Sequence, residues 1–345
     1  MGGDLGPAAA VEGAVQAARE LAIPVVIVGD EPQIRACLEK TEGPKAPVDV
    51  CHAPTVVEMT DAPGKVLRQK RDSSMAVAMG LMKRGEASAL VSPGNTGAVM
   101  AFGLNILKRL PGVERPAIAA VVPTVKGEAV MLDMGANVDC KPSYLAQFAL
   151  MGEAYARMVQ GKTRPKVALL SNGSEVGKGN QLTRDAARLL RGIDIDFAGP
   201  IEGRDLFRGA VDVVVQDGFV GNVVLKTFEG AVDAIRTFLR MEIERSVVSK
   251  AAAVALKPAF DRFKKRLDYS EYGGAPLLGL KGVCIVCHGA SPPKAFKNAI
   301  RVASRFASTG LNDALTTQIR KNAHVVAEGR RTLAAERRAN GKPEA

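Results

Sequence analysis

The polar and apolar positions of this chain form two kinds of segment. Segments in which apolar residues recur every three or four positions predict helices, and short unbroken apolar runs predict buried strands. The predicted helices cover residues 7–21, 73–83, 96–110, 142–159, 181–190, 292–306 and 311–331. The predicted strands cover residues 23–28, 87–91, 117–122, 129–132, 167–170, 211–216 and 282–287. The consecutive strands 117–122 and 129–132 are expected to form a hairpin across Lys126 and Gly127. Unbroken apolar strands joined by helices predict an α/β fold with a mostly parallel sheet covered by helices on both faces.

The pattern changes after Asn222, where two long helical stretches over residues 223–248 and 251–266 predict a helical hairpin. In the second stretch the apolar residues fall on one face and the cations on the other. The apolar residues are Phe260, Phe263 and Leu267, and the cations are Lys257, Arg262, Lys264, Lys265 and Arg266. This pattern fits a helix packed on a neighbour, and it also fits a helix that docks on a membrane surface or a partner. The apolar pair Leu277 and Leu278, read as an exposed tip, favours the second interpretation.

Five short glycine-bearing turns are spread over the chain, most of them directly after a predicted strand. They occupy residues 1–7, 92–97, 133–137, 171–180 and 217–222. Glycine allows backbone N–H groups to converge on an anion, and a following helix directs its positive end to the same point. Ligands of α/β sheets bind at the carboxyl ends of strands. The turns therefore predict a crevice that holds a phosphate or an oxyanion.

Composition narrows the class of partner. The 47 Lys and Arg residues exceed the 36 Asp and Glu residues by 11, which favours an acidic partner. Nucleic acid is disfavoured, because aromatic residues make up only 4% of the chain. No segment has the pattern of a membrane span or a secretory signal, so we expect a cytoplasmic protein.

The five cysteines predict reduced thiols rather than a disulfide framework. Cys284, Cys287 and His288 match the spacing of a c-type haem attachment site. We reject that site, because strand alternation places the two cysteines on opposite faces. No second Cys or His pair is spaced to complete a zinc site, so we expect no metal.

Lys178 lies between two glycines, but the surrounding turn does not match a phosphate-binding P-loop. Asn172 replaces the first glycine of that motif, and Gly179 replaces the hydroxyl residue that would hold magnesium. Lys178 is either a solvated lysine near a helix start or the charge partner of an anion. Asn222 is either the N-cap of the long helix or a donor to an oxyanion.

Asp133 and Asp217 each end a strand, where they either form turns or act in the site. His288 is either a buried structural histidine or a member of the crevice. We find no activated nucleophile, since Cys140 looks exposed but has no evident base.

The turns together closely resemble those of the phosphate acyltransferase (PlsX) family of bacterial phospholipid synthesis. The shared motifs are M-G-G-D-x-G-P at Met1, S-P-G-N-T-G at Ser92, L-D-x-G-A-N at Leu132, S-N-G-S-E-x-G-K-G at Ser171, D-G-F-V-G-N at Asp217 and H-G-x-S at His288. They occur in the family order over essentially the whole chain. This sequence departs from the family pattern in one respect. Family members usually have a short apolar strand with an Asp just before the first motif, whereas the sequence here starts with that motif at Met1.

The resemblance implies that Lys178 and Asn222 are the catalytic residues. It implies that phosphate and substrate are bound by the motif residues Gly2, Gly3, Asp4, Ser92, Gly94, Asn95, Thr96, Gly97, Asp133, Gly135, Asn137, Ser174, Glu175, Gly177, Gly179, Asp217, Gly218, Phe219, Gly221, His288 and Gly289. The implied reaction converts acyl-acyl-carrier-protein and inorganic phosphate to acyl phosphate and free carrier protein, without a cofactor. Two alternatives stay open: a phosphotransacetylase-like enzyme that uses acyl-coenzyme A, and a non-catalytic regulator that binds acyl carrier protein.

The resemblance also implies a three-layer αβα fold with a Rossmann-like sheet, similar to phosphotransacetylase and the isopropylmalate dehydrogenase group. We expect one catalytic unit over residues 1–335, a helical dimerisation and membrane-facing segment at 223–280 within it, and a frayed tail at 336–345. The implied assembly is a homodimer, peripherally associated with the inner face of the membrane. A membrane glycerol-3-phosphate acyltransferase is the implied consumer of the acyl phosphate.

Overall fold

The structure is a computed structural model that describes residues 1–41, 43, 46–175 and 177–339. Its centre is an eight-stranded sheet with the strand order β3-β10-β9-β4-β5-β8-β6-β7. The strands are β3 (Ala89–Ser92), β4 (Ala117–Thr124), β5 (Gly127–Leu132), β6 (Lys166–Leu170), β7 (Asp196–Ile201), β8 (Val213–Val215), β9 (Ala275–Leu278) and β10 (Val283–Val286). A separate parallel pair is formed by β1 (Val25–Gly29) and β2 (Val48–His52).

The direction of the strands divides the large sheet into two halves. β3 and β10 are parallel to each other, and β5, β8, β6 and β7 form a second parallel group. The antiparallel strands β9 and β4 join the two groups, and β4 and β5 form the predicted hairpin. As a result β3 and β10 run opposite to β5, β8 and β6, and their carboxyl ends lie at opposite edges of the sheet.

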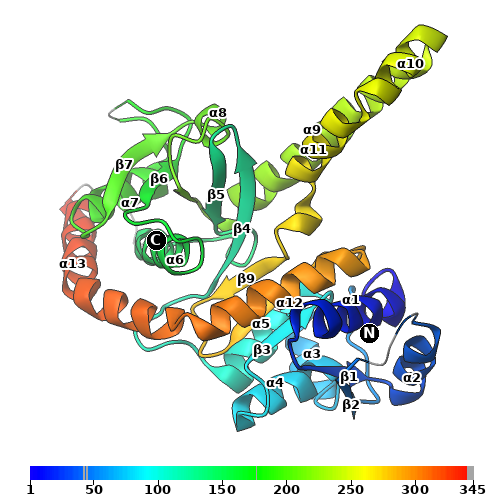
Figure 1. Cartoon of the computed structure of the whole chain (residues 1–345). Coiled ribbons are helices and arrows are strands. Elements are labelled where there is room, and N and C mark those ends of the chain that lie inside the picture. The colour runs from blue at the N-terminus through cyan, green and yellow to red at the C-terminus, as the bar shows by residue number, and fades with distance from the viewer. Residues whose placement is uncertain (42, 44–45, 176, 340–345) are drawn as a thin grey trace.

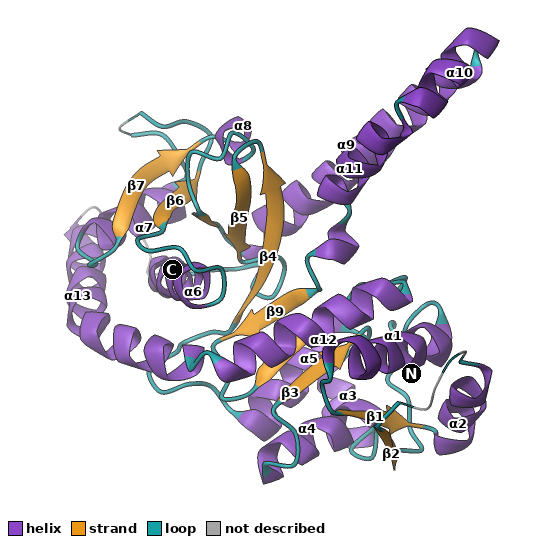
Figure 2. Ribbon diagram, in the orientation of Figure 1, coloured by secondary structure: helices purple, strands orange, loops and turns teal. Residues whose placement is uncertain are grey.

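Helices cover both faces of the sheet, as predicted (Figure 2). One apolar layer packs on α1 (Gly6–Leu21), α6 (Pro142–Met158), α7 (Gln181–Arg191), α12 (Pro293–Ser308) and α13 (Leu311–Ala339). The other packs on α3 (Pro63–Gln69), α4 (Ser74–Arg84), α5 (Thr96–Phe102), the π-helical turn η1 (Gly103–Leu107) and α8 (Gly203–Leu206). The buried Cys287 belongs to the first layer and the buried Cys284 to the second, which confirms that they face opposite sides.

A helical arm projects from this body, as the sequence predicted (Figure 1). It consists of α9 (Gly218–Glu244), α10 (Val247–Ala255) and α11 (Lys257–Leu267), so the single helix expected at 251–266 is in fact divided between α10 and α11. Neither α10 nor α11 has a buried residue. The five cations predicted to face outward from 257–266 are exposed, and Phe260 and Leu267 are half-buried.

The prediction that Leu277 and Leu278 form an exposed membrane tip is wrong. Both lie in β9, where Leu277 is 2% exposed and Leu278 is not exposed at all. β9 pairs with β10 on one side and β4 on the other, so it lies in the middle of the sheet. The helical segment therefore ends near the short 3-10 turn η2 (Tyr269–Glu271), and not at residue 280.

Further elements were not predicted: α2 (Glu31–Lys40), β2, α3, β7 and α8. In the predicted frayed tail, residues 336–339 belong to α13, and residues 340–345 lie outside the described residues. Of the helices that the structure describes, none combines the length and the apolar character that a membrane span needs.

Candidate active site

The first glycine turn meets two others at the edge where β3 and β10 end, and we call Gly3, Asp4, Pro93 and Gly289 the Asp4 cluster. The Asp4 amide donates a hydrogen bond to the Gly289 carbonyl at 2.9 Å. A Cβ built on Gly3 would lie 3.1 Å from both the Gly289 carbonyl oxygen and the Pro93 side chain. Segments from the start, the first third and the last fifth of the chain therefore converge here.

Asn95, beside this cluster, is held by its own chain. Its Oδ1 accepts a hydrogen bond from the Ala98 amide at 3.0 Å and so caps α5. Its Nδ2 donates to the carbonyls of Glu58, Met59 and Asp61 at 3.2, 3.2 and 2.8 Å. The carboxamide is thus occupied in tying the loop before α3 to the start of α5, which is a positioning role.

His288 lies on the same side of the sheet, directly after β10. The interpretation as a buried structural histidine is wrong, because the side chain is exposed. Its Nδ1 accepts a hydrogen bond from the Ala290 amide at 3.2 Å, so the ring is oriented by the turn that follows it.

Asp133, at the opposite edge, is a fully buried carboxylate that orders its own turn. It accepts hydrogen bonds from the amides of Ile118, Ala136 and Asn137 at 2.9, 3.2 and 2.6 Å, and from Asn137 Nδ2 at 2.9 Å. Burial raises the pKa of Asp133, and these hydrogen bonds oppose the rise. The alternative that Asp133 has a turn-forming role is therefore the one that the geometry supports.

The start of α9 packs directly against this turn because two glycines allow it. A Cβ built on Gly221 would lie 1.9 Å from the Asp133 carbonyl oxygen, and one on Gly218 would lie 2.7 Å from the Asn137 carbonyl oxygen. Both contacts are with backbone, which cannot move aside as a side chain can. Asp217 is the N-cap of α9, since its Oδ1 accepts a hydrogen bond from the Val220 amide at 2.8 Å.

Asn222 is consequently not the N-cap of α9 but its fifth residue. Its side-chain atoms lie 3.7–4.0 Å from a Cβ built on Gly135, in the turn after β5. The side chain is exposed, and within the described part of the chain no hydrogen bond engages its carboxamide. We call Asp133–Asn137 and Gly218–Asn222 together the Asn222 cluster, and Asn222 is the member with a free donor.

Gln216 is a member of this site that the sequence analysis missed. It is 2% exposed, and its Nε2 donates to the Asp133 carbonyl oxygen at 3.2 Å. The signal was present, because Gln216 is the polar last residue of the predicted strand 211–216, directly before the glycine turn at 217–222.

The turn after β6, residues 171–180, forms the Lys178 loop; Val176 lies outside the described residues. Asn172 Oδ1 accepts a hydrogen bond from the Gly179 amide at 2.8 Å, and Asn180 caps α7 through the Thr183 amide at 2.8 Å. Lys178 lies two residues before that cap, its side chain exposed, and among the described residues it has no ion-pair partner. Its ammonium group is thus available to an anion.

The placement of β5, β8 and β6 brings the Asn222 cluster and the Lys178 loop to one edge. The three strands are parallel neighbours in the sheet, so the turns that follow them extend in the same direction. The Asp4 cluster belongs to the opposite edge. The described residues show no hydrogen bond between the two clusters, so the single crevice that holds all five turns stays a prediction.

The cysteines near the site are poor nucleophiles. Cys140 is half-buried rather than exposed, and its Sγ donates to the Asn137 carbonyl at 3.4 Å. Burial, with the nearby carboxylates of Asp133 and Asp217, raises the pKa of Cys140 to about 12. Burial also raises the pKa of Cys284 and of Cys287 to about 12. In the part of the chain that the structure describes, no three His, Cys, Asp or Glu side chains are grouped to hold a metal ion.

Sequence comparison agrees with the motifs. The profile of a family described as fatty acid synthesis protein matches residues 1–314. The chain is 51% identical over 322 residues to a phosphate acyltransferase of Citrifermentans bemidjiense, with 93% of this chain and 92% of the relative covered. It is 48% identical over 336 residues to a phosphate acyltransferase of Geotalea daltonii, with 97% of each chain covered.

Comparison with solved structures supports the fold alone. The EutD phosphotransacetylase of Staphylococcus aureus superimposes with a TM-score of 0.57 at 15% identity, over 87% of this chain and 92% of that one. A phosphotransacetylase of Streptococcus pyogenes gives a TM-score of 0.56 at 17% identity, over 86% and 91%. The predicted resemblance and the predicted fold class are confirmed, and the chain belongs to the fatty acid synthesis protein family and is an acyltransferase.

Proposed function

We propose that this protein transfers a fatty acyl group from the thioester of acyl-acyl-carrier-protein to inorganic phosphate. The observation that carries the proposal is the placement of Lys178 and Asn222 at one edge of the sheet, where among the described residues neither side chain has an ion-pair or hydrogen-bond partner. A cation suits the phosphate, and a carboxamide N–H suits an oxygen that gains negative charge.

In the proposed step a phosphate oxygen attacks the thioester carbonyl carbon. The carbonyl oxygen becomes an oxyanion, the C–S bond then breaks, and the leaving thiolate takes the proton of the hydrogen phosphate. The products are acyl phosphate and the free thiol of the carrier. Lys178 neutralises the phosphate, and Asn222 donates to the oxyanion or to the incoming phosphate.

Direct attack, without an acyl-enzyme, is supported by the state of the cysteines. A thiol whose pKa is about 12 is almost entirely protonated near neutral pH, and Cys140, Cys284 and Cys287 are all of this kind. A radiolabelled acyl group that stays on the protein in the absence of phosphate would contradict the direct route.

The test of the substrate is phosphate-dependent thiol release, measured in parallel with acyl-acyl-carrier-protein and acyl-coenzyme A. We expect release from the carrier protein, and only when phosphate is present. Release from coenzyme A alone would favour the phosphotransacetylase-like alternative. Binding of the carrier with no release of thiol would favour the regulator.

The basic surface supports an acidic carrier as the partner. The chain has a net charge of +11, and exposed charges attract an oppositely charged protein over about 8 Å at physiological ionic strength. We therefore propose that KM for the carrier rises with salt; a KM that is unchanged between low and high salt would remove this argument.

The arm supports two further proposals, a homodimer and a peripheral contact with the inner face of the membrane. Exposed apolar side chains run along the outer part of α9: Ile235, Phe238, Leu239 and Met241. They suit the pairing of α9 with a second copy.

The membrane contact is supported by the far end of the arm and by α11. Val247 and Val248 at the far end are 82% and 80% exposed, and the cations of α11 suit an anionic leaflet.

A cytoplasmic enzyme held at the membrane would release its poorly soluble acyl phosphate where a membrane glycerol-3-phosphate acyltransferase can take it. Because Leu277 and Leu278 are buried in β9, we propose that the exposed Val247 and Val248 form the apolar tip of the arm instead. Phe260, Phe263 and Leu267 remain the proposed apolar stripe of α11.

A further inference from the structure

Gln216 directly follows β8 and binds the end of the neighbouring strand β5. It is 2% exposed; its amide donates to the Leu132 carbonyl at 2.6 Å, and its carbonyl accepts from the Asp133 amide at 2.9 Å. Its side chain returns to the same strand end, where Nε2 donates to the Asp133 carbonyl at 3.2 Å and to Met134 Sδ at 3.6 Å. Backbone and side chain together thus tie Gln216 to the start of the turn after β5.

The Asp133 carbonyl is the group on which the first turn of α9 rests. A Cβ built on Gly221 would lie 1.9 Å from that oxygen and 3.0 Å from Gln216 Nε2, so donor, carbonyl and helix backbone meet at one point. The next residue is Asn222, whose side chain lies 3.7–4.0 Å from a Cβ built on Gly135 in the same turn. A shift of the Asp133 carbonyl would therefore move the Asn222 carboxamide.

The rest of the turn is held by other groups. The amides of Ala136 and Asn137 donate to the Asp133 carboxylate, and the Gly218 amide donates to the Asn137 carbonyl at 2.8 Å. Among the described residues, Gln216 Nε2 is the one side-chain donor to the Asp133 carbonyl oxygen. The position of that carbonyl therefore depends on Gln216.

We infer that Gln216 is a positioning residue for the proposed reaction: it fixes the Asp133 carbonyl and so sets where the start of α9 places the Asn222 carboxamide. The inference rests on the proposed function, since it takes Asn222 as the donor to the oxyanion or to the phosphate. Gln216 acts through Asn222 because its own side chain is buried away from any substrate. Donors in a reaction site need to lie within about 0.5 Å of their productive position.

The orientation of the Gln216 amide agrees with this role. Its Oε1 is buried and has no hydrogen-bond partner among the described residues, while Nε2 faces the Asp133 carbonyl. The reversed amide would place two acceptors against each other. An unpaired buried acceptor costs stability, and an apolar side chain of similar length would avoid that cost, so the donor on Nε2 accounts for a glutamine at this position.

The test is Gln216→Met, which keeps the length of the side chain and removes the donor. Phosphate-dependent thiol release from acyl-acyl-carrier-protein is measured over a range of carrier and phosphate concentrations. We expect kcat to fall about tenfold, because a misplaced donor stabilises the oxyanion less. We expect KM for both substrates to change by less than about twofold. If Gln216→Met does not fold, Gln216→Asn, whose shorter side chain draws the donor away from the carbonyl, carries the same expectations.

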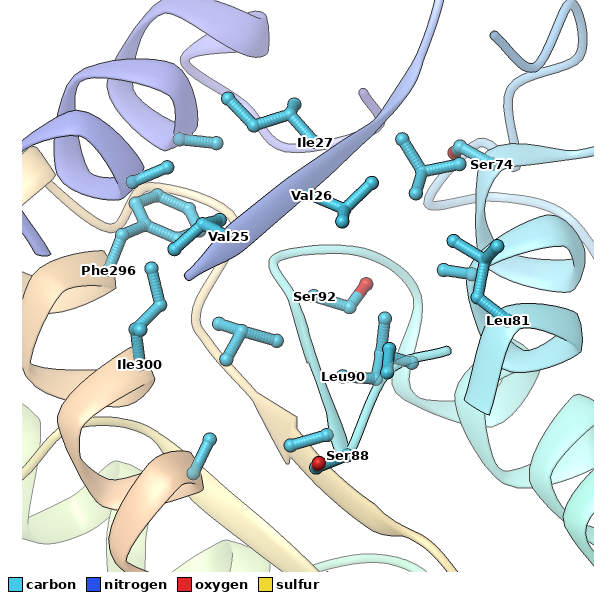
Figure 3. Close-up of a pocket in the computed structure, with 18 of the residues that line it drawn as sticks. Val25, Val26, Ile27, Ser74, Leu81, Ser88, Leu90, Ser92, Phe296 and Ile300 are labelled. Atoms are coloured by element: carbon cyan, nitrogen blue, oxygen red, sulfur yellow. The ribbon is translucent and has the colours of Figure 1, made fainter. Parts of the chain in front are cut away.

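Two control variants separate positioning from a general loss of stability. Gln147→Met changes a glutamine that is 5% exposed and bonds the backbone of Gly112 and Glu114, in the segment before β4. Ile300→Val removes one methylene at the apolar cavity between β1 and β3 (Figure 3), and β10, β9, β4 and β5 separate β3 from β8. We expect both variants to keep kcat within about twofold of the wild type.

A double variant shows whether Gln216 acts through Asn222. In the Asn222→Ala background, Gln216→Met should lower kcat by less than about twofold, because the group that it positions is gone. A full tenfold effect in that background, an unchanged kcat in the single variant, or an equal loss in Gln147→Met would overturn the inference. Wild-type thiol release by Asn222→Ala would instead contradict the role of Asn222 in the proposed function, so the two failures are distinguishable.

Discussion

The Asp4 cluster and the Asn222 cluster are built from the same kind of glycine turn, at opposite edges of one sheet. At the Asp4 edge the carboxamide of Asn95 is consumed by four hydrogen bonds to its own chain. At the other edge Asp133 and Asp217 are consumed in the same way, but Asn222 is left without a described partner. A polar residue in a glycine turn can therefore be assigned to the reaction only when its side chain is not already engaged in hydrogen bonds within the protein.

The two clusters differ also in what their glycines touch. Gly221 lies against the backbone carbonyl of Asp133, which is fixed by the sheet. Gly289 lies against the carboxylate of Asp4, the far end of an exposed side chain. The Asn222 edge is therefore rigid where it meets the start of α9, and the Asp4 edge can adapt by a movement of the Asp4 side chain.

The largest expected effect follows from this difference. Gly221→Ala places a Cβ 1.9 Å from the Asp133 carbonyl oxygen, so we expect about 3 kcal/mol or more of destabilisation and loss of activity. Gly289→Ala meets Asp4 Oδ2 at 2.7 Å, a contact that a rotation of Asp4 relieves, so we expect less than about 1 kcal/mol. Urea unfolding of both variants measures the difference.

Gly230→Ala is the control in the same helix, because nothing lies within 4 Å of its Cβ. We expect it to stabilise the protein by about 0.5–1 kcal/mol through helix propensity. Equal destabilisation by Gly221→Ala and Gly289→Ala would remove the distinction between a rigid and a yielding edge.

The two asparagines should separate chemistry from stability. Asn222→Ala should lower kcat/KM by about 100-fold, the cost of one lost oxyanion donor, with unfolding unchanged. Asn95→Ala should instead lower the free energy of unfolding by about 2 kcal/mol, because it removes a helix cap and leaves carbonyls unpaired. If Asn222→Ala unfolds the protein and keeps its activity when folded, the assignment of Asn222 is wrong.

Variants of the arm test whether binding to the membrane is separate from the reaction at the Asn222 edge. Val247→Glu with Val248→Glu should reduce binding to anionic vesicles by about tenfold or more, with phosphate-dependent thiol release unchanged. Met59→Glu, which changes an exposed methionine in the loop before α3, away from the arm, is the control. Unchanged vesicle binding in the double variant would contradict the membrane role of this end of the arm.

The Cys140 thiol, beside the Asn222 cluster, tests the direct route through its reactivity. With a pKa of about 12, its alkylation by iodoacetamide at pH 8 should be about a thousandfold slower than in the urea-unfolded chain. Its rate should rise about tenfold per pH unit from pH 8 to about pH 11, whereas the rate of an ordinary thiol, with a pKa of about 8.5, levels off above about pH 9.5. Mass spectrometry of the modified peptide follows both rates; fast labelling at pH 8 would reopen the acyl-enzyme route.

The sequence predicted the layers, the β4–β5 hairpin and the helical arm, because each depends on a local pattern. It missed β9 because Pro276 and the flanking glycines resemble a loop, and the burial of Leu277 comes from pairing with β4, far away in the chain. It missed β7, whose Gly199 and Pro200 are tolerated because this strand lies at the edge of the sheet.

The glycine turns were found from the sequence, but the role of each polar residue within them was not. The interpretation of Asn222 as an N-cap failed because α9 begins earlier, with Asp217 as its cap and Asn222 as its fifth residue. The glycine just before Asn222 is thus part of the helix, where it packs on the Asp133 backbone. Which polar groups remain unengaged depends on contacts between strands that only the fold brings together.

We propose that Lys178 supplies the charge that phosphate needs, and one comparison of three proteins tests this role. Phosphate-dependent thiol release from acyl-acyl-carrier-protein is compared in the wild type, in Lys178→Ala and in Lys83→Ala, an exposed lysine on α4. We predict that Lys178→Ala lowers kcat/KM by about 100-fold or more in a folded protein, and that Lys83→Ala changes it by less than about twofold. Activity of Lys178→Ala within about threefold of the wild type would contradict the account.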